Sequence, residues 1–247
     1  MGWGSEKMKV TSEKQRLHLE KLMAGNVFTK NKMAKISIAI VTNRQVQPKT
    51  LQSLLELAHN NKHHELDFVV ATEGYTTAQG RIYCVIQAQK NQSNFILYVD
   101  DDMTFEPDIL DRLLEHNKEI VGVNSYSRTF PLSSTVMMMD ENGEYKDPSK
   151  NTEWAMEVPE KLFEVLAIGM GVALIKMEVF ENINKPWFKF DIHRDGYMIQ
   201  GEDAWFCSQA RKEGYKIWAD GSLEIGHIGN YIYKKPERKL STFIENK

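Results

Sequence analysis

From residue 36 onward, short apolar runs alternate with amphipathic segments. Runs rich in β-branched and aromatic residues predict buried strands at 36–42, 66–72, 95–99 and 120–124. Between them, apolar residues at helical spacing predict helices that begin at Pro48, at 78–89 and at 107–116. Strands that alternate with helices of this length indicate βαβ units. The pattern therefore predicts an α/β protein with a mainly parallel central sheet.

The pattern is less regular after residue 126. Asn142-Gly143 predicts a hairpin turn between 136–139 and 144–146. Beyond it come an apolar run at 165–175, a helix at 202–213 that stops at Gly214, and two short strands that end near His227. We expect one domain at 36–235, preceded by a helical and basic extension at 1–35 and followed by a tail at 236–247.

Composition and charge exclude several classes of protein. The 247 residues carry a formal net charge of -3 with both signs interspersed, so nucleic acid is not expected as a partner. The two cysteines, Cys84 and Cys207, are expected to be buried thiols. The sequence has neither a cleavable leader nor an apolar run that could span a bilayer, which predicts a cytoplasmic protein. The charged, amphipathic extension would allow peripheral membrane contact.

Three consecutive aspartates, Asp100, Asp101 and Asp102, follow the apolar run at 95–99. Because side chains alternate along an extended chain, Asp100 and Asp102 can point to the same side. Carboxylates this close repel one another unless a cation lies between them. Hard divalent ions such as Mg²⁺ or Mn²⁺ prefer oxygen ligands and often complete their shell with substrate phosphates. An acidic turn in solvent is the alternative, and the strand context favours the metal site.

Two further groups of polar residues are candidates for a site. Gly201-Glu202-Asp203 opens a predicted helix, where acidic residues complement the helix dipole but can equally supply a general base for an attacking hydroxyl. His227 ends a short strand between Gly226 and Gly229, whose small size allows a ligand to approach. By contrast, the histidines at 59, 63 and 64 are interpreted as a solvated helix end rather than a metal site.

These groups occur in the order of a known family. The segments 98–103 (YVDDDM), 201–207 (GEDAWFC) and 226–227 (GH) together resemble nucleotide-sugar glycosyltransferases of the GT-A fold, most of all family-2-like bacterial and viral members. The resemblance covers about residues 35–231, most of the chain. It implies a three-layer αβα GT-A (Rossmann-like) fold, with 36–235 as the glycosyltransferase domain.

The resemblance also implies roles for individual residues. Asp102 and His227 would hold a divalent metal, with Asp100 in the metal shell or on the donor ribose. Asp203 would be the catalytic base, and Glu202 would orient it or touch the acceptor. The remaining residues implied on the donor side are Thr42, Arg81, Asp100, Asp101, Gly169 and Gly171.

The expected activity is metal-dependent, with Mn²⁺ or Mg²⁺, and moves a sugar from a nucleoside-diphosphate sugar to a hydroxyl of a glycan, lipid or protein acceptor. An Arg-Trp motif common in inverting members has no clear equivalent here, so the stereochemistry stays open.

Two alternative functions also stay open. Asp100 to Thr104 matches the Asp-x-Asp-x-Thr opening of haloacid-dehalogenase-like phosphatases, in which Asp100 would be a nucleophile, although that motif normally lies near the N-terminus. A catalytically silent nucleotide- or glycan-binding module is the other.

Overall fold

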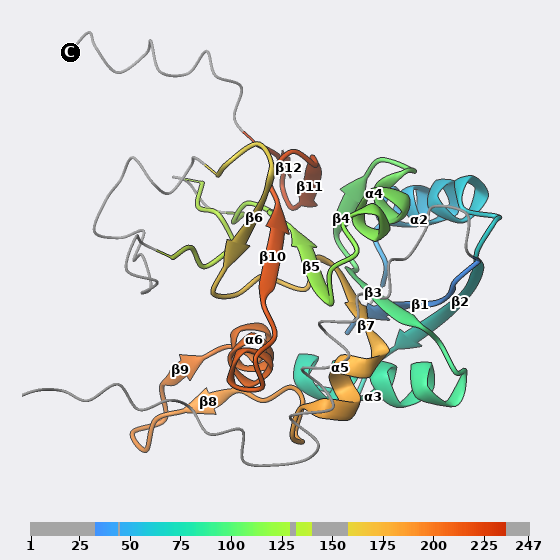
Figure 1. The fold of residues 1–247 in the computed structure, drawn as a ribbon. Coiled ribbons are helices and arrows are strands. Elements are labelled where there is room, and N and C mark those ends of the chain that lie inside the picture. Colours follow the sequence, from blue (N-terminus) through green and yellow to red (C-terminus); the bar gives the residue numbers. More distant parts are fainter. Residues whose placement is uncertain (1–32, 44, 129–131, 140–157, 236–247) are drawn as a thin grey trace, which may run out of the picture.

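A computed structural model describes residues 33–43, 45–128, 132–139 and 158–235 (Figure 1). The predicted turn at Asn142-Gly143, the C-terminal tail and all but the last three residues of the predicted extension lie outside these ranges. A central seven-stranded sheet has the order β2-β1-β3-β7-β5-β10-β6. Its strands, in chain order, are β1 (Lys35–Val41), β2 (Glu65–Ala71), β3 (Phe95–Asp100), β5 (Ile120–Val123), β6 (Leu162–Val165), β7 (Val172–Lys176) and β10 (Ile217–Asp220).

Five of the seven strands run in the same direction. Strand β1 is parallel to β2 and β3, and β10 is parallel to β5, whereas β7 is antiparallel to both of its neighbours and β6 is antiparallel to β10. The predicted mainly parallel sheet is confirmed. Because β7 runs the opposite way, its first residue, Val172, pairs with Val99 near the carboxyl end of β3. The segment before β7 therefore reaches the sheet edge where the parallel strands end.

Helices cover both faces of this sheet, which makes three layers (Figure 1). Helices α2 (Pro48–Asn60) and α4 (Ile109–Glu115) share one core cluster with the β1 residues Ile36, Ile38 and Ile40. Helices α3 (Thr77–Lys90), α5 (Met177–Asn182) and α6 (Glu202–Lys212) share the other cluster with Ala39 of the same strand. Both faces of β1 are buried, which explains why five of its seven residues are apolar. The three-layer αβα prediction is confirmed.

Two small sheets flank the central one. Strands β4 (Met103–Phe105), β11 (Ile225–Ile228) and β12 (Ile232–Tyr233) form one, in the order β12-β11-β4. Strands β8 (Asp191–Ile192) and β9 (Met198–Gln200) form the other, just before α6. Pairing of His227 with Met103 in the first small sheet brings two segments more than 120 residues apart into contact.

Two local features of the chain, a helix stop and the state of its cysteines, agree with the prediction. Gly214 has a φ of +89°, and α6 ends just before it, as expected of a helix stop. Cys84 and Cys207 are buried free thiols, as predicted. Trp187 is 2% exposed and packs edge-on against Phe180, so it belongs to the core. No helix in the described ranges is long and apolar enough to cross a membrane.

The interpretation of the histidines at the end of α2 as solvated is wrong for His64. Its side chain is 4% exposed, and its Nδ1 accepts a hydrogen bond from the Ala34 amide at 3.2 Å. The hydrogen of the neutral ring is therefore on Nε2, which lies 3.4 Å from Asp111 Oδ1. His63 reaches the same oxygen at 3.0 Å. The three side chains are close enough to hold a metal ion, but this orientation of His64 directs an N–H, not a lone pair, toward Asp111.

Candidate functional site

A cavity of about 360 Å³ opens at the carboxyl edge of the central sheet. The end of β3, the segment before β7, the first turn of α6 and strand β11 all contribute to its wall. Six residues singled out from the sequence line it: Asp100, Gly169, Gly171, Glu202, Asp203 and His227. Ligands of open α/β sheets bind at this edge, so its position agrees with that rule.

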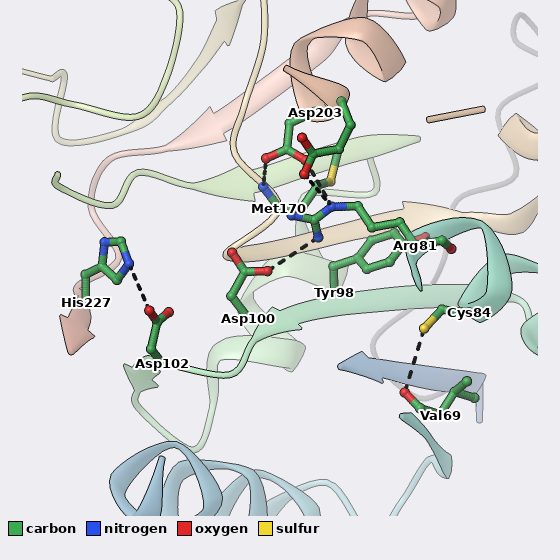
Figure 2. A network of polar contacts seen from close by, with 10 residues as sticks. Val69, Arg81, Cys84, Tyr98, Asp100, Asp102, Met170, Asp203 and His227 are labelled. Atoms are coloured by element: carbon green, nitrogen blue, oxygen red, sulfur yellow. Dashed lines mark hydrogen bonds and ion pairs between the residues drawn. The ribbon is translucent and has the colours of Figure 1, made fainter. Parts of the chain in front are cut away.

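Arg81 lies in α3 behind the cavity and connects the carboxylates of two elements (Figure 2). Its Nη1 is 3.4 Å from Asp100 Oδ1, and its Nε is 3.4 Å from Glu202 Oε1 and 3.1 Å from Asp203 Oδ1. The side chain is 3% exposed. Burial would lower the pKa of Arg81, but the three carboxylates raise it above the usual value, so the guanidinium stays charged. The structure thus gives Arg81 three carboxylate partners, whereas the resemblance implies a role on the donor side.

Asp203, in the first turn of α6, has an unusual environment for a carboxylate. Its Oδ2 accepts a hydrogen bond from the Met170 amide at 3.1 Å. Its Oδ1 is buried and, among the described residues, makes no hydrogen bond, because the Arg81 Nε–H beside it is not directed at it. Burial raises the pKa of Asp203 to about 7, with Glu202 and Asp100 adding to the rise and Arg81 and Met170 opposing it. A carboxylate with this pKa can accept a proton at neutral pH.

Asp102 and His227 face each other across the junction of β4 and β11 (Figure 2). Asp102 Oδ2 is 3.4 Å from His227 Nε2, and His227 Nδ1 is 2.9 Å from the Tyr126 carbonyl oxygen. A carbonyl only accepts, so Nδ1 carries a hydrogen and Nε2 of the neutral ring presents a lone pair toward Asp102. Burial lowers the pKa of His227, but Asp102 and the Tyr126 carbonyl raise it above the usual value.

This pair fits a divalent metal in its chemistry. A metal-bound histidine usually donates its other N–H to a carbonyl or carboxylate, as His227 does to Tyr126. Mg²⁺ and related ions are often held by one or two carboxylates plus substrate phosphates. The third expected ligand, Asp100, is not gathered with the other two: it faces Arg81, and the three do not form a group with ligand atoms within 4.8 Å of one another in the described ranges.

Thr42 and Asp101 lie beside the cavity rather than in its wall. Thr42 is buried at the end of β1, where its amide donates to the Ala71 carbonyl at 2.9 Å. Burial raises the pKa of Asp101, while a hydrogen bond from the Thr42 side chain opposes that rise. The Asp101 carbonyl accepts from the Gln47 amide at 2.8 Å. These contacts tie the aspartate segment to the start of α2.

The two glycines before β7 have different surroundings. A Cβ on Gly171 would lie 2.6 Å from Cε of Met103, so the buried methionine fills the space that the missing side chain leaves. A Cβ on Gly169 would meet only Thr135 and Asp203, at 3.7 to 3.9 Å. Gly171 therefore allows Met103 to pack closely against the backbone. Gly169 leaves space in the cavity next to Asp203.

Residues of the loops after β5 also belong to the site, although no motif marks them in the sequence. Ser125, Thr135 and Met137 line the cavity, and the hydroxyls of Ser125 and Thr135 are 2.9 Å apart. Arg128 approaches from outside: its Nη1 is 2.7 Å from Asp102 Oδ2. Ser125 follows the predicted strand 120–124, but none of these residues lies in a recognisable motif, and only the folded chain brings them to the aspartates.

The chain is similar to known proteins in its structure rather than in its sequence. Neither a protein-family model nor a curated protein matches the sequence. A197 from STIV has 16% identity and a TM-score of 0.55, over 83% of this chain and 95% of that chain. The chain has a GT-A type fold. The fold that the motifs imply is thereby confirmed.

Two other structures are similar at lower scores. GalNAc-T7, solved with UDP, GalNAc and Mn²⁺, has 11% identity and a TM-score of 0.44, over 80% of this chain and 44% of that chain. Residues 1–349 of S. aureus TarS in complex with UDP-GlcNAc have 16% identity and a TM-score of 0.38, over 85% of this chain and 62% of that chain. The chain therefore spans less than two thirds of either protein.

Proposed function

We propose that the protein is a glycosyltransferase that moves a sugar from a nucleoside-diphosphate sugar to an acceptor hydroxyl, with Mn²⁺ or Mg²⁺ as cofactor. The observation that carries the proposal is that a carboxylate with a pKa near neutral lies beside a pair of residues that could bind a divalent metal through oxygen and nitrogen. Asp203, with a pKa of about 7, lines the same cavity as His227, and His227 faces Asp102. The GT-A type fold supports it.

On the donor side, Asp102 and His227 would hold the metal, with Asp100 beside them. A divalent ion bound there supplies a positive charge that offsets the charge developing on the diphosphate leaving group. Thr42 and Asp101, at the ends of β1 and β3, would contact the nucleoside. Arg81 would keep Asp100 and Asp203 in fixed positions, because one guanidinium is within 3.4 Å of both carboxylates.

On the acceptor side, Asp203 would take the proton of the attacking hydroxyl. The Met170 amide holds Oδ2 of this carboxylate, which orients it. Glu202, on the same helix turn, would touch the acceptor or keep Asp203 aligned through their common partner Arg81. Gly169 leaves room for a sugar ring beside Asp203, since nothing within 3.5 Å would obstruct even an added Cβ.

The same proposal assigns residues 36–235 as the catalytic domain and takes the acceptor to be a glycan, lipid or protein. The proposal also includes a cytoplasmic location and contact of residues 1–35 with a membrane surface. They can be checked separately, by fractionation of cells and by binding of the full chain to lipid vesicles.

Calorimetric titration tests the donor site. UDP, GDP, CDP, ADP and dTDP are titrated in turn with Mn²⁺, with Mg²⁺ and with a chelator, into the full chain and an Asp102→Ala variant. We expect one nucleotide to bind only with metal, and the variant to lose that binding. If no nucleotide binds under any condition, the proposal is wrong, and a phosphomonoester assay with an Asp100→Asn variant becomes the next experiment.

A further inference from the structure

Arg128 makes the shortest ion pair of the candidate site. Its Nη1 lies 2.7 Å from Asp102 Oδ2, the same oxygen that lies 3.4 Å from His227 Nε2. The same Nη1 is also 3.5 Å from the Ile228 carbonyl. A Cβ on Gly229 would lie 3.1 Å from Arg128 Cδ, so the glycine makes room for the arginine stem. The backbone at Ile228 and Gly229 thus accommodates the ion pair between Arg128 and Asp102.

Hydrogen bonds hold the backbone beside Arg128, whereas the side chain of Arg128 is exposed. The Ser127 amide donates to the Ser133 carbonyl at 2.9 Å, and the Ser133 amide donates to the Ser127 hydroxyl at 3.0 Å. These bonds hold the backbone next to Arg128. The arginine side chain itself is 51% exposed, and its contacts to described residues run through Nη1 alone. With respect to the part of the chain that the structure describes, Nη2 and Nε can therefore donate to a further anion.

A guanidinium and a divalent ion compete for one carboxylate oxygen. Oxygen ligands lie roughly 2.0–2.1 Å from Mg²⁺. The arginine nitrogen lies 2.7 Å from Asp102 Oδ2, so the metal would come closer to this oxygen. Two cations at these distances from Oδ2 would repel each other strongly. A metal held by Asp102 and His227 would therefore displace the guanidinium. A diphosphate on that metal would be the nearest anion, and its oxygens match the planar donor fork of arginine.

We propose that Arg128 is a diphosphate ligand that occupies Asp102 in the donor-free protein, so that metal and nucleotide bind interdependently. Without nucleotide, Arg128 weakens metal binding by competing for Asp102. With nucleotide, Arg128 turns to the diphosphate and strengthens the complex. This inference rests on the proposed function, because it requires a metal-dependent nucleotide site at Asp102.

The test measures binding, not turnover. Mn²⁺ alone is titrated into the full chain and followed by the electron paramagnetic resonance signal of free Mn²⁺. The nucleoside diphosphate selected by the screen above is then titrated at saturating Mn²⁺ by calorimetry. For Arg128→Gln we expect Mn²⁺ alone to bind about five- to tenfold more tightly, and the nucleotide about tenfold more weakly, typical of coupling between two sites.

Two variants act as controls. Arg128→Lys keeps the charge but loses the planar fork, so Mn²⁺ affinity should stay within about twofold of wild type while nucleotide affinity falls. Arg211→Gln removes an exposed arginine in the last turn of α6, about 12 Å along the helix from Asp203, and should change neither affinity. Thermal melting of each variant confirms that it is folded.

The outcomes separate this inference from the proposed function. If wild type binds nucleotide with metal and Arg128→Gln changes neither affinity, the inference is wrong and the proposed function stands. Weaker binding of Mn²⁺ alone to Arg128→Gln also overturns it, because the arginine would then support the metal rather than compete with it. If wild type binds no nucleotide under any metal condition, both fail.

Discussion

Two arginines pair with the two outer aspartates of the same tripeptide, and their surroundings differ greatly. Arg81 is 3% exposed and has three carboxylate partners from β3 and α6, at 3.1 to 3.4 Å. Arg128 is 51% exposed and has one carboxylate partner at 2.7 Å. The shorter contact is thus the one in solvent, where an ion pair is worth about 0–1 kcal/mol. The longer contacts are buried, where loss of one partner leaves uncompensated charge.

This comparison separates a fixed cation from an exchangeable one. Without Arg81, three partly buried carboxylates would lie close together without a counter-charge, so Arg81 defines the geometry of Asp100, Glu202 and Asp203. Arg128 can exchange its partner at little cost, because water replaces the lost contact. Distance alone would rank the two pairs in the wrong order, and burial together with the number of partners ranks them correctly.

The largest effect is expected where the Arg81 cluster meets the proposed chemistry. Asp203→Asn keeps the size of the side chain but removes its ability to accept a proton. Because general base catalysis contributes about 10²- to 10⁴-fold, kcat/KM should fall by that factor while metal-dependent nucleotide binding persists. Steady-state kinetics with the matching nucleotide sugar measures it. Asp108→Asn, at an exposed position before α4, is the matched control, and an equal loss in both variants would contradict the role of Asp203.

Removal of the buried cation should destabilise the fold. Arg81→Gln leaves Asp100, Glu202 and Asp203 close together without a counter-charge, which we expect to cost about 3–5 kcal/mol in the free energy of unfolding. These carboxylates would then hold protons more tightly in the folded state, so the loss should be smaller near pH 5 than at pH 8. Urea unfolding at both pH values tests this. A pH-independent change below about 1 kcal/mol would show that Arg81 is not the anchor of the cluster.

The pH dependence of the reaction distinguishes the two arginines. Asp203 has a pKa of about 7 and must be deprotonated to act as a base, so kcat/KM should decline below pH 7 and approach a tenfold fall per pH unit. Arg81 lowers the pKa of Asp203 and so opposes the effect of burial. Arg81→Lys, which pairs less closely with this carboxylate, should therefore move the decline of kcat/KM to higher pH. Arg128→Gln should leave the pH of this decline unchanged. A flat profile from pH 5.5 to 8 in wild type would exclude Asp203 as the titrating base.

The smallest effect is expected for the exposed arginine in the free protein. Arg128→Gln should change the free energy of unfolding by less than about 1 kcal/mol, since exposed ion pairs contribute little. Even that change should disappear at about 1 M NaCl, where the Debye length is about 3 Å. Urea unfolding at low and high salt measures both. A loss above 2 kcal/mol would mean that Arg128 is a structural residue like Arg81.

Much of the fold could be predicted because buried strands leave a strong sequence pattern. The run 36–42 lies within one residue of β1, and Asp100 lies at the end of β3 as the strand context indicated. The run 165–175 was less informative. Residues 166–171 lie outside the sheet, between β6 and β7, and contribute to the cavity wall. The hydrophobic pattern of an apolar run does not distinguish a continuous strand from one that is interrupted by a turn. Strand β4, with three residues, is too short to show a period.

The partners of the charged residues could not be predicted from the sequence. Arg81 appears in the sequence as one cation in an amphipathic helix, and its burial depends on where Asp100 and α6 arrive in the fold. Arg128 has no motif around it, and its contact with Asp102 spans 26 positions. Local patterns therefore identify the acidic residues of the site, and tertiary structure decides which cation each of them meets.

The position of β7 has a consequence for how the chain folds. This strand pairs with both β3 and β5, yet it begins at Val172, about fifty residues after β5 ends. During synthesis, β3 keeps one open edge and β5 keeps both edges open until residues 172–176 emerge, since β10 comes still later in the chain. Open edges are templates for pairing between chains. Closing a sheet across such a separation is slow compared with local pairing. Nascent chains that end before Val172 are therefore expected to be the aggregation-prone species in expression, and the cavity wall at Gly169 forms only when β7 joins the sheet.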